Sequence, residues 1–587
     1  MPSIPHFADL LENNEPPSDA ILQEVSELCA IARNDLLQID AEIQRLQEKR
    51  AVIQKSIDSY ITISSPIRGL PTDILREIFY HCLDSTRNHI MSAAEAPMLL
   101  THVCSPWRSV ALTSPNMWAK LHIPLPGDPR VLSRLDSLSD EAIENFNQTF
   151  SEMMGRRCRA VKEWLARSGS CFLSLSISYP HYDTYFDGRE GSVPIIEVES
   201  DTFTHEIFHI LVSFVQRWRS LDLSMPSLIY QQLETRIPSK NMLSNLRTLR
   251  VVLDPNIQSG GNVSPPLLLL EAPNMRMFSL NAFQLTSAST ILPPHLGGLL
   301  TDLCLDSYIS DEDLLKFLQA CHCLVNCQIL VRAPFRRRHP SGSASVVCLP
   351  YLKKLKLFES SHLSPSLRLI TAPSLTFFQY GNPRPSYNVI TGMWFSLSGN
   401  KTMKWFIGNS SSTLRTLAIT ALNLCQKILP LLQLPVGIKC LHVFEWRDKL
   451  GPHVGTKFTD LSTLKVEYPT SDSPARVLFP NLEVLEVDHP CDHHDDELLQ
   501  LFTSRIDAAT RGDVSPLKWV KLHLSRREKK DIAEKVSAYA RSVGIEMKFE
   551  VLYPPDLTVT LVPSKLHYIR HLSPSFLLPD PPFLPSF

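Results

Sequence analysis

One motif in the sequence is typical of zinc catalysis, namely His205-Glu206-Ile207-Phe208-His209. On a helix the two histidines lie one turn apart, where both can bind Zn²⁺ while the glutamate acts as a general base. The Gly-x-x-His extension that would supply a third histidine is absent, because Val212 and Val215 occupy the Gly and His places, and Glu234 would be a distant third ligand. The segment is equally typical of a helix that leads into a strand, so we keep a zinc metalloprotease as an alternative only.

Two further segments are rich in metal ligands, but neither has the paired spacing of a structural zinc site. The segment Cys491-Asp492-His493-His494-Asp495-Asp496-Glu497 is typical of an acidic helix start, because carboxylates are favourable at the positive end of a helix. The segment Cys321-His322-Cys323, with Cys327 after it, is more typical of thiols in the core of a repeat. We therefore predict no metal and no other cofactor.

The composition argues against other classes of function. The 587 residues include 58 Lys and Arg against 60 Asp and Glu, a net charge of -2, which gives no global attraction for nucleic acid or an anionic membrane. No apolar run approaches the ~18 residues that span a bilayer, and the N-terminus has no signal-peptide pattern. The odd count of 13 cysteines is typical of reduced thiols and predicts a cytoplasmic or nuclear protein. Arg336-Arg337-Arg338 is either a nuclear signal or, as we favour, a solvated loop.

A long helix is predicted over residues 18–62. From Leu22 to Tyr60 apolar residues recur at steps of three and four, an a/d heptad register that only Arg50 breaks. Ser18 favours the helix start and Pro66 its end. The pattern predicts either a coiled coil that binds a partner helix, or a helix that folds back on its own protein.

Three short helices are predicted over residues 65–123. Pro71 opens the first, whose apolar residues Ile74, Leu75, Ile78, Phe79 and Cys82 form one broad face. Pro97 opens the second, and Pro106 opens the third, which contains Trp107. About sixty residues in three short helices bury little surface alone, so the exposed apolar remainder is expected to bind a partner.

In order and spacing this segment resembles an F-box of the kind found in many proteins of mushroom-forming fungi. The resemblance is carried by Leu70-Pro71, by the Ile74/Leu75/Ile78/Phe79 face, and by Val103-Cys104 followed by Trp107-Arg108. The segment departs from the family in the long stretch from Asp84 to Glu95 and in Pro106, where a basic residue is usual.

The resemblance implies a function. In the family such a module binds a Skp-type adaptor, which links the protein to a cullin-RING (SCF-type) ubiquitin ligase. The chain would then be a substrate receptor and not an enzyme, because the transfer chemistry belongs to other subunits; a non-catalytic scaffold independent of the ligase is the alternative. The implied adaptor-binding residues are Leu70, Pro71, Ile74, Leu75, Ile78, Phe79, Val103, Cys104 and Trp107.

The C-terminal region repeats an apolar triplet in which the second residue follows the first by three positions and the third by five. Most steps between triplets are 21 to 29 residues, and the pattern resembles the irregular leucine-rich repeats that follow F-boxes. The Asn or Cys expected three residues after the last apolar site is absent. The first apolar residues lie at positions 246, 275, 300, 324, 352, 375, 414, 438, 461 and 482.

In a solenoid of such repeats, the residue between the last two apolar sites lies on the concave face of a parallel sheet. One substrate-binding surface is thus predicted from Arg250, Gln328, Lys356, Gln379, His442, Lys465, Glu486 and Lys521. The predicted fold class is α/β, with the long helix at 18–62, an F-box at 65–123, a helical linker at 124–170, a leucine-rich-repeat-like solenoid at 171–552 and a disordered Pro-rich tail at 553–587. The partners would be the adaptor and ligase, an unidentified protein substrate and a helix partner for residues 18–62, with neither nucleic acid nor membrane.

Overall fold

The chain folds into two compact units. The first comprises Met1–Ser85 and Ser92–Met117, and the second comprises Thr86–Met91 and Trp118–Phe587. No helix among the described residues is long and apolar enough to cross a bilayer. The computed structural model describes residues 10, 16–125, 140–179, 202–254, 268–282, 293–309, 311–331, 346–359, 368–381, 387–388, 393–394, 406, 412–420, 437–444, 461, 464–468, 477–491, 493–524 and 531–553.

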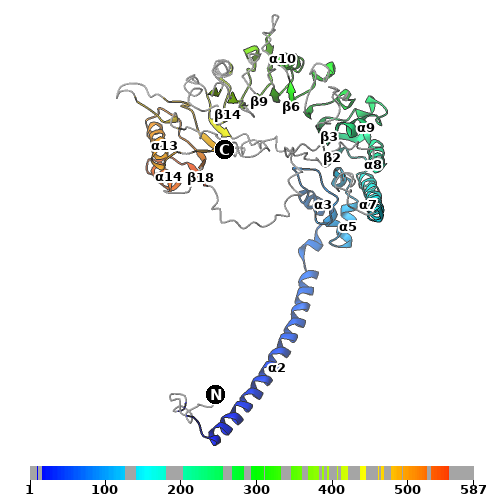
Figure 1. Ribbon diagram of the computed structural model, residues 1–587, viewed down its shortest axis with the longest axis vertical. Helices are drawn as coiled ribbons and strands as arrows, with labels where there is room; N and C mark the ends of the chain where they lie inside the picture. The colour runs from blue at the N-terminus through cyan, green and yellow to red at the C-terminus, as the bar shows by residue number, and fades with distance from the viewer. Residues whose placement is uncertain are drawn as a thin grey trace. The chain divides into compact units, whose positions relative to one another are not determined.

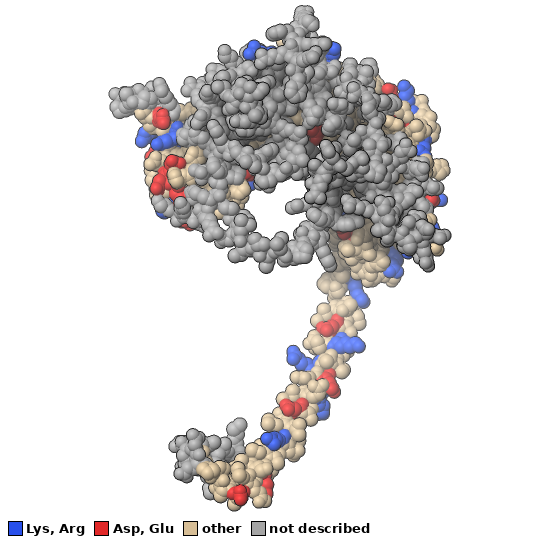
Figure 2. All heavy atoms as spheres, in the orientation of Figure 1, with Lys and Arg blue, Asp and Glu red and all other residues tan. Residues whose placement is uncertain are grey.

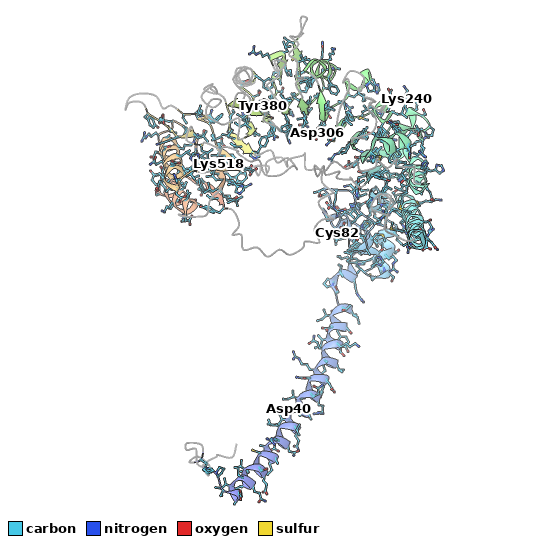
Figure 3. The ribbon with its side chains drawn as sticks, in the orientation of Figure 1. Asp40, Cys82, Lys240, Asp306, Tyr380 and Lys518 are labelled. Atoms are coloured by element: carbon cyan, nitrogen blue, oxygen red, sulfur yellow. The ribbon has the colours of Figure 1, made fainter. Side chains whose placement is uncertain are left out.

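The first unit begins with one long helix, α2 (Asp19–Ile63), in which no residue is buried. Its bounds confirm the predicted helix to within a residue at each end. Both basic and acidic side chains lie along its surface (Figure 2), and one of them, Arg45, binds Glu42 through Nη2 and Oε1 at 2.7 Å. The apolar a/d residues are therefore exposed along the length of α2.

Three short helices complete the first unit, namely α3 (Thr72–His81), α4 (Met98–Thr101) and α5 (Ser105–Leu112). Helix α5 packs against both α3 and α4. The ring of Phe79 is fully buried and lies 4.9 Å from the ring of Trp107, centroid to centroid. This aromatic pair joins the first helix to the third.

The second unit is built on a 14-stranded sheet in which every pair of neighbouring strands is parallel and the strands follow one another in chain order. Two two-stranded sheets lie outside it, β8 (Val347–Cys348) with β10 (Ile370–Thr371) and β12 (Tyr387–Asn388) with β13 (Met393–Trp394). The 14 strands are β1 (Lys120–Pro124), β2 (Leu173–Ser178), β3 (Trp218–Pro226), β4 (Thr248–Asp254), β5 (Met277–Ala282), β6 (Asp302–Ile309), β7 (Asn326–Val331), β9 (Lys354–Glu359), β11 (Phe377–Gly381), β14 (Thr416–Thr420), β15 (Cys440–Phe444), β16 (Val484–Cys491), β17 (Trp519–Leu524) and β18 (Lys548–Leu552).

Apolar side chains from every strand form continuous buried rows beneath the sheet. The pairing register places Leu249 beside Phe278 and Val251 beside Leu280, and both pairs are buried. The same two positions are buried in strand after strand, and all ten first apolar residues of the predicted repeats are buried as well. Burial of aliphatic and aromatic side chains of this size contributes about 1.5–3 kcal/mol each, so these rows are the main source of stability.

Helices connect many of the strands and cover the side of the sheet that carries these rows. Figure 1 shows α7 (Asp140–Arg167), α8 (Thr202–Val212), α9 (Ser227–Glu234) and α10 (Asp311–Ala320) on the side away from the strand labels. Near the other end lie α13 (Asp495–Thr510) and α14 (Ile532–Ser542), which pack against each other. An α/β architecture with a parallel sheet, as predicted, follows directly.

The predicted boundaries at 65–123 and 124–170 differ from the observed units. Strand β1 pairs with β2 and thus belongs to the large sheet, and α7 buries Trp164 against Trp118 with ring centroids 4.7 Å apart. The sheet therefore begins about fifty residues earlier than residue 171. The long stretch noted between α3 and α4 is divided, because residues 86–91 belong to the second unit, where the His122 N–H donates to the His89 carbonyl at 2.7 Å.

The predicted repeat that begins at Leu461 supplies no strand in its described residues, and β15 pairs directly with β16. Its backbone is bonded to α13 instead: Arg505 donates to the Leu464 carbonyl at 3.0 Å, and the Val466 N–H donates to the Ser504 hydroxyl at 3.3 Å. Lys465 consequently does not join the sheet. The predicted tail from residue 554 onward and the triplet at 336–338 lie outside the described residues.

Arg505 should be essential for the stability of this end of the second unit. Arg505 is 2% exposed, and its guanidinium also donates to the carbonyls of Leu478 and Phe479, at 3.2 and 2.8 Å. Arg505→Met would leave three carbonyls without this donor and should lower the free energy of unfolding by ~2–4 kcal/mol. Urea unfolding of the full chain measures this, with Arg541→Met as the exposed control; equal midpoints for the two variants would contradict it.

Candidate functional site

The first unit exposes large apolar side chains that its own core does not use. Ile74 and Ile78, one turn apart on α3, are 47% and 37% exposed, while Leu99 on α4 and the following Val103 are 44% and 54% exposed. Polar side chains at such exposed positions would reduce the folding stability of the unit only slightly, so stability does not require apolar residues there. Exposed apolar clusters are typical of protein-binding surfaces. We call these four residues the apolar face.

The adaptor-binding residues implied by the resemblance divide into two groups. Leu75 and Phe79 are buried, and Trp107 is half-buried against Phe79, so these three support the unit from inside. The others are accessible to a partner to different degrees: Leu70 is half-buried, whereas Pro71, Ile74, Ile78, Val103 and Cys104 are exposed. Leu99 was not among the predicted residues, although it lies one turn from Val103.

Seven of the eight predicted substrate-binding residues lie in one row across the sheet. The strand pairing places Asp222 beside Arg250, Gln328 beside Lys356, and Glu486 beside Lys521, with each residue on the face opposite the buried rows. The eighth, Lys465, lies outside the sheet for the reason given above. The full row reads His122, Ser176, Asp222, Arg250, Ser279, Cys304, Gln328, Lys356, Gln379, Ala418, His442, Glu486, Lys521 and Glu550.

The prediction that this row is a surface is wrong for four of its members, because Gln328, Gln379, His442 and Glu486 are buried. The cause is visible in their neighbours. Phe358, Phe377, Ala418 and Phe444 are buried in one cluster on the same face of the sheet, with Leu330 packed against them. Sequence reasoning missed this cluster, yet runs such as Lys354-Leu-Lys-Leu-Phe and Leu441-His-Val-Phe, with a Phe next to the buried position, could have indicated it. Arg250, Lys356 and Lys521 are only partly buried.

A charged network occupies this face near β15, β16 and β17. His442 Nε2 lies 2.8 Å from Asp488 Oδ2, and Lys521 Nζ lies 2.9 Å from Glu486 Oε1 and 3.5 Å from Asp488 Oδ1. The hydrogen bond to Glu486 raises the pKa of Lys521. In the described part of the chain, ligand atoms of His442, Glu486 and Asp488 lie within 4.8 Å of one another, as in a metal site. The Lys521 ammonium, however, already provides a cation that contacts both carboxylates.

The zinc motif lies on α8 as predicted, but its surroundings do not assemble a metal site. The guanidinium of Arg236 contacts Nδ1 of His205, and a fixed positive charge there opposes a cation. The distant ligand Glu234 accepts hydrogen bonds from the Tyr230 hydroxyl at 2.5 Å and the Leu269 N–H at 3.0 Å. Burial raises the pKa of Glu234 to about 7, which further weakens it as a ligand.

The two other ligand-rich segments are accounted for by local structure. The His494 N–H donates to Glu497 Oε2 at 3.2 Å at the start of α13, whose first turn also contains Asp495 and Asp496. The Cys321 and Cys327 thiols are buried, and burial raises the pKa of Cys321 to about 12, so neither thiolate forms near neutral pH. Both findings agree with the sequence interpretation of these segments.

One further feature was missed, namely a line of exposed basic residues at the edge of the sheet where the strands begin. The signal was present in the sequence, because in many repeats the residue directly after the first apolar position is basic. We call this line the basic rim; its members are Arg219, Arg247, Arg276, Lys353, Arg415, Lys439 and Lys518.

Comparison of the sequence with models of known protein families and with curated proteins found no match. The functional argument therefore depends on the residues and on the geometry described above.

We predict that His205 and His209 bind no metal, because Arg236 contacts one histidine and Glu234 is bonded elsewhere. Elemental analysis of the purified chain should give the same zinc content for the wild type and for the His205→Ala, His209→Ala variant. Loss of one equivalent of zinc in that variant, but not in a His322→Ala control, would show the prediction to be wrong.

A separate prediction concerns the exposed seam of α2. In a parallel in-register homodimer the Arg50 side chains would meet in one layer, and Asp35 would face Asp40 of the second copy, a repulsion of a few tenths of a kcal/mol. A peptide of residues 18–62 should therefore not form a stable parallel dimer, as measured by sedimentation equilibrium. Efficient oxidation to a Cys29–Cys29 disulfide within a dimer would refute this, since those sulfurs meet only in parallel register.

Proposed function

We propose that the chain is the substrate-recognition subunit of a cullin-RING (SCF-type) ubiquitin ligase, with an F-box in its first unit. The observation that carries this proposal is the apolar face of Ile74, Ile78, Leu99 and Val103. A unit of this size needs buried apolar surface for its stability, so large apolar side chains that stay exposed indicate a binding surface. In the F-box family the residues at the motif positions of Ile74, Ile78 and Val103 bind a Skp-type adaptor.

The packing beneath the apolar face supports the same proposal. The Phe79–Trp107 contact fixes α3 against α5, and the Arg108 Nε–H donates to the Thr101 carbonyl at 2.7 Å, which ties α5 to α4. The backbone that presents the apolar face is thus fixed before any partner binds. Binding then loses little conformational entropy, which favours affinity.

The second unit would supply substrate recognition. Its parallel sheet, chain-ordered strands and connecting helices support a leucine-rich-repeat-like solenoid, whose repeats offer a long surface rather than a pocket. Among the predicted row, Arg250, Lys356 and Lys521 remain accessible enough to contact a protein substrate. The chain itself would perform no covalent step, since ubiquitin transfer takes place on other subunits.

A non-catalytic scaffold independent of the ligase is the second candidate. The observation that favours it is α2, whose 45 residues include no buried one and which therefore offers a second apolar surface for a partner helix. The two candidates differ in whether the apolar face binds the adaptor.

The deciding experiment is a pulldown of the full chain with purified Skp-type adaptor. Ile74→Lys with Ile78→Lys should weaken retention by ~30-fold or more, because two anchors of an interface are lost while the core is untouched. Leu37→Lys on α2, also an exposed apolar position, is the matched control and should bind as the wild type does. Absence of wild-type retention would refute the receptor function and leave the scaffold.

A further inference from the structure

The basic rim is a single line, because the backbone places its residues at equivalent positions in successive strands. The Arg247 carbonyl accepts hydrogen bonds from Arg276 N at 2.8 Å and Met277 N at 3.0 Å, and the pattern recurs along the edge of the sheet. Neighbouring strands lie ~4.8 Å apart, so Arg219 near the start of β3, and Arg247 and Arg276 directly before β4 and β5, form a run about 10 Å long. Thr301, Val325, Thr376 and Glu483 occupy the intervening positions of the same line.

Most of the charge on the rim is not neutralised within the described residues. Glu483 pairs with Lys439 at 2.5 Å and with Lys518 at 2.7 Å, so one carboxylate serves two ammonium groups. No carboxylate of the described chain forms an ion pair with the other five members. With the whole chain at a net charge of -2, the rim is a local concentration of positive charge.

Two of the four guanidinium groups of the rim, those of Arg276 and Arg415, are held by hydrogen bonds to neutral carbonyls. Arg276 Nη1 donates to the Leu299 carbonyl at 3.3 Å, and Arg415 Nη1 donates to the Gly437 carbonyl at 3.4 Å. A Cβ at position 437 would lie 2.5 Å from that Nη1, so glycine provides the space for Arg415. Each guanidinium keeps its charge and further N–H donors, which suit the planar oxygens of a carboxylate.

We propose that the basic rim binds an extended acidic polypeptide segment. In an extended chain the side chains on one side recur every ~6.7 Å, a spacing that flexible arginines set ~4.8 Å apart can meet. The rim is one residue wide. The residues that directly follow Arg219, Arg247 and Arg276 in the strands, Ser220, Thr248 and Met277, carry no charge, so the positive charge there forms a narrow line. A nucleic acid fits less well, because base recognition uses open aromatic rings, and the ring of Phe172 beside the rim has Arg219 over it at 5.7 Å.

If the acidic segment belongs to a substrate, the inference names the class of that substrate and rests on the proposed receptor function. Binding of an acidic peptide to the rim does not depend on that function. A fluorescently labelled decapeptide of alternating Glu and Ser is titrated with the full chain and followed by anisotropy. Arg219→Gln, Arg247→Gln and Arg276→Gln together should weaken binding at least ~10-fold, and raised salt should weaken wild-type binding. The matched control replaces the exposed Arg156, Arg159 and Arg541 by Gln and should bind as the wild type does.

Absence of wild-type binding, or equal losses in the two triple variants, would overturn the proposal. Tighter rim-dependent binding of a ten-nucleotide uridine RNA than of the peptide would also overturn it, in favour of a nucleic-acid surface. The peptide titration and the adaptor pulldown test different proposals. If the pulldown fails, the rim can still bind acidic peptides, but not as the substrate site of a ligase. If the titration fails, the proposal of adaptor binding is unaffected.

Discussion

The structure depends on one constraint, the register of its parallel strand pairs. Side chains alternate between the two faces of a strand, so a slip of one residue would exchange the buried row with the polar row. Leu221, Leu249 and Phe278 remain neighbours on three strands only because each strand enters the sheet at the equivalent residue. The carbonyl of the residue just before the strand enforces this by accepting bonds from the next repeat. The same bonds align the residues of the rim, so the alignment of its charged side chains follows from the register that packs the core.

How far the sequence predicts this structure differs between its two faces. The buried face follows from apolar spacing alone, and Leu246, Met275 and Leu300 are each buried as expected. The opposite face does not follow from spacing, because a polar residue such as Gln379 satisfies the alternation whether it meets water or lies beside Phe377. Burial there depends mainly on segments distant in sequence, and only runs such as Leu441-His-Val-Phe, with a Phe next to the buried position, give a local signal of it. The repeat at Leu461 shows the same limit, since the competing bonds come from Arg505 about forty residues later.

The candidate site was also predicted in part: the sequence indicated its helices and apolar residues, but not which of these residues are exposed. The segment from Leu70 to Trp107 indicated three helices with surplus apolar residues, but the period of a helix could not separate Ile74 and Ile78, which are exposed, from Leu75 and Phe79, which are buried. That division depends on where α5 packs. The sequence placed His442 and Lys521 in one row, but it did not indicate Asp488, and it inserted a strand with Lys465 between β15 and β16, which in fact pair directly.

Residues 86–91 belong to the second unit, although the residues before and after them belong to the first. This limits where the chain can be divided between the two units. The chain leaves the first unit after Ser85, contributes Asn88 and His89 to the second, and returns at Ser92. There the Ser174 hydroxyl donates to Asn88 Oδ1 at 2.9 Å, and His89 provides a carbonyl to the outermost strand β1. β1 is an edge strand, which exposes unpaired backbone groups to other chains unless something covers them. A fragment beginning at Trp118 would lack this cover, so gene fusion, recombination or proteolysis between the units would uncover a strand edge prone to aggregation.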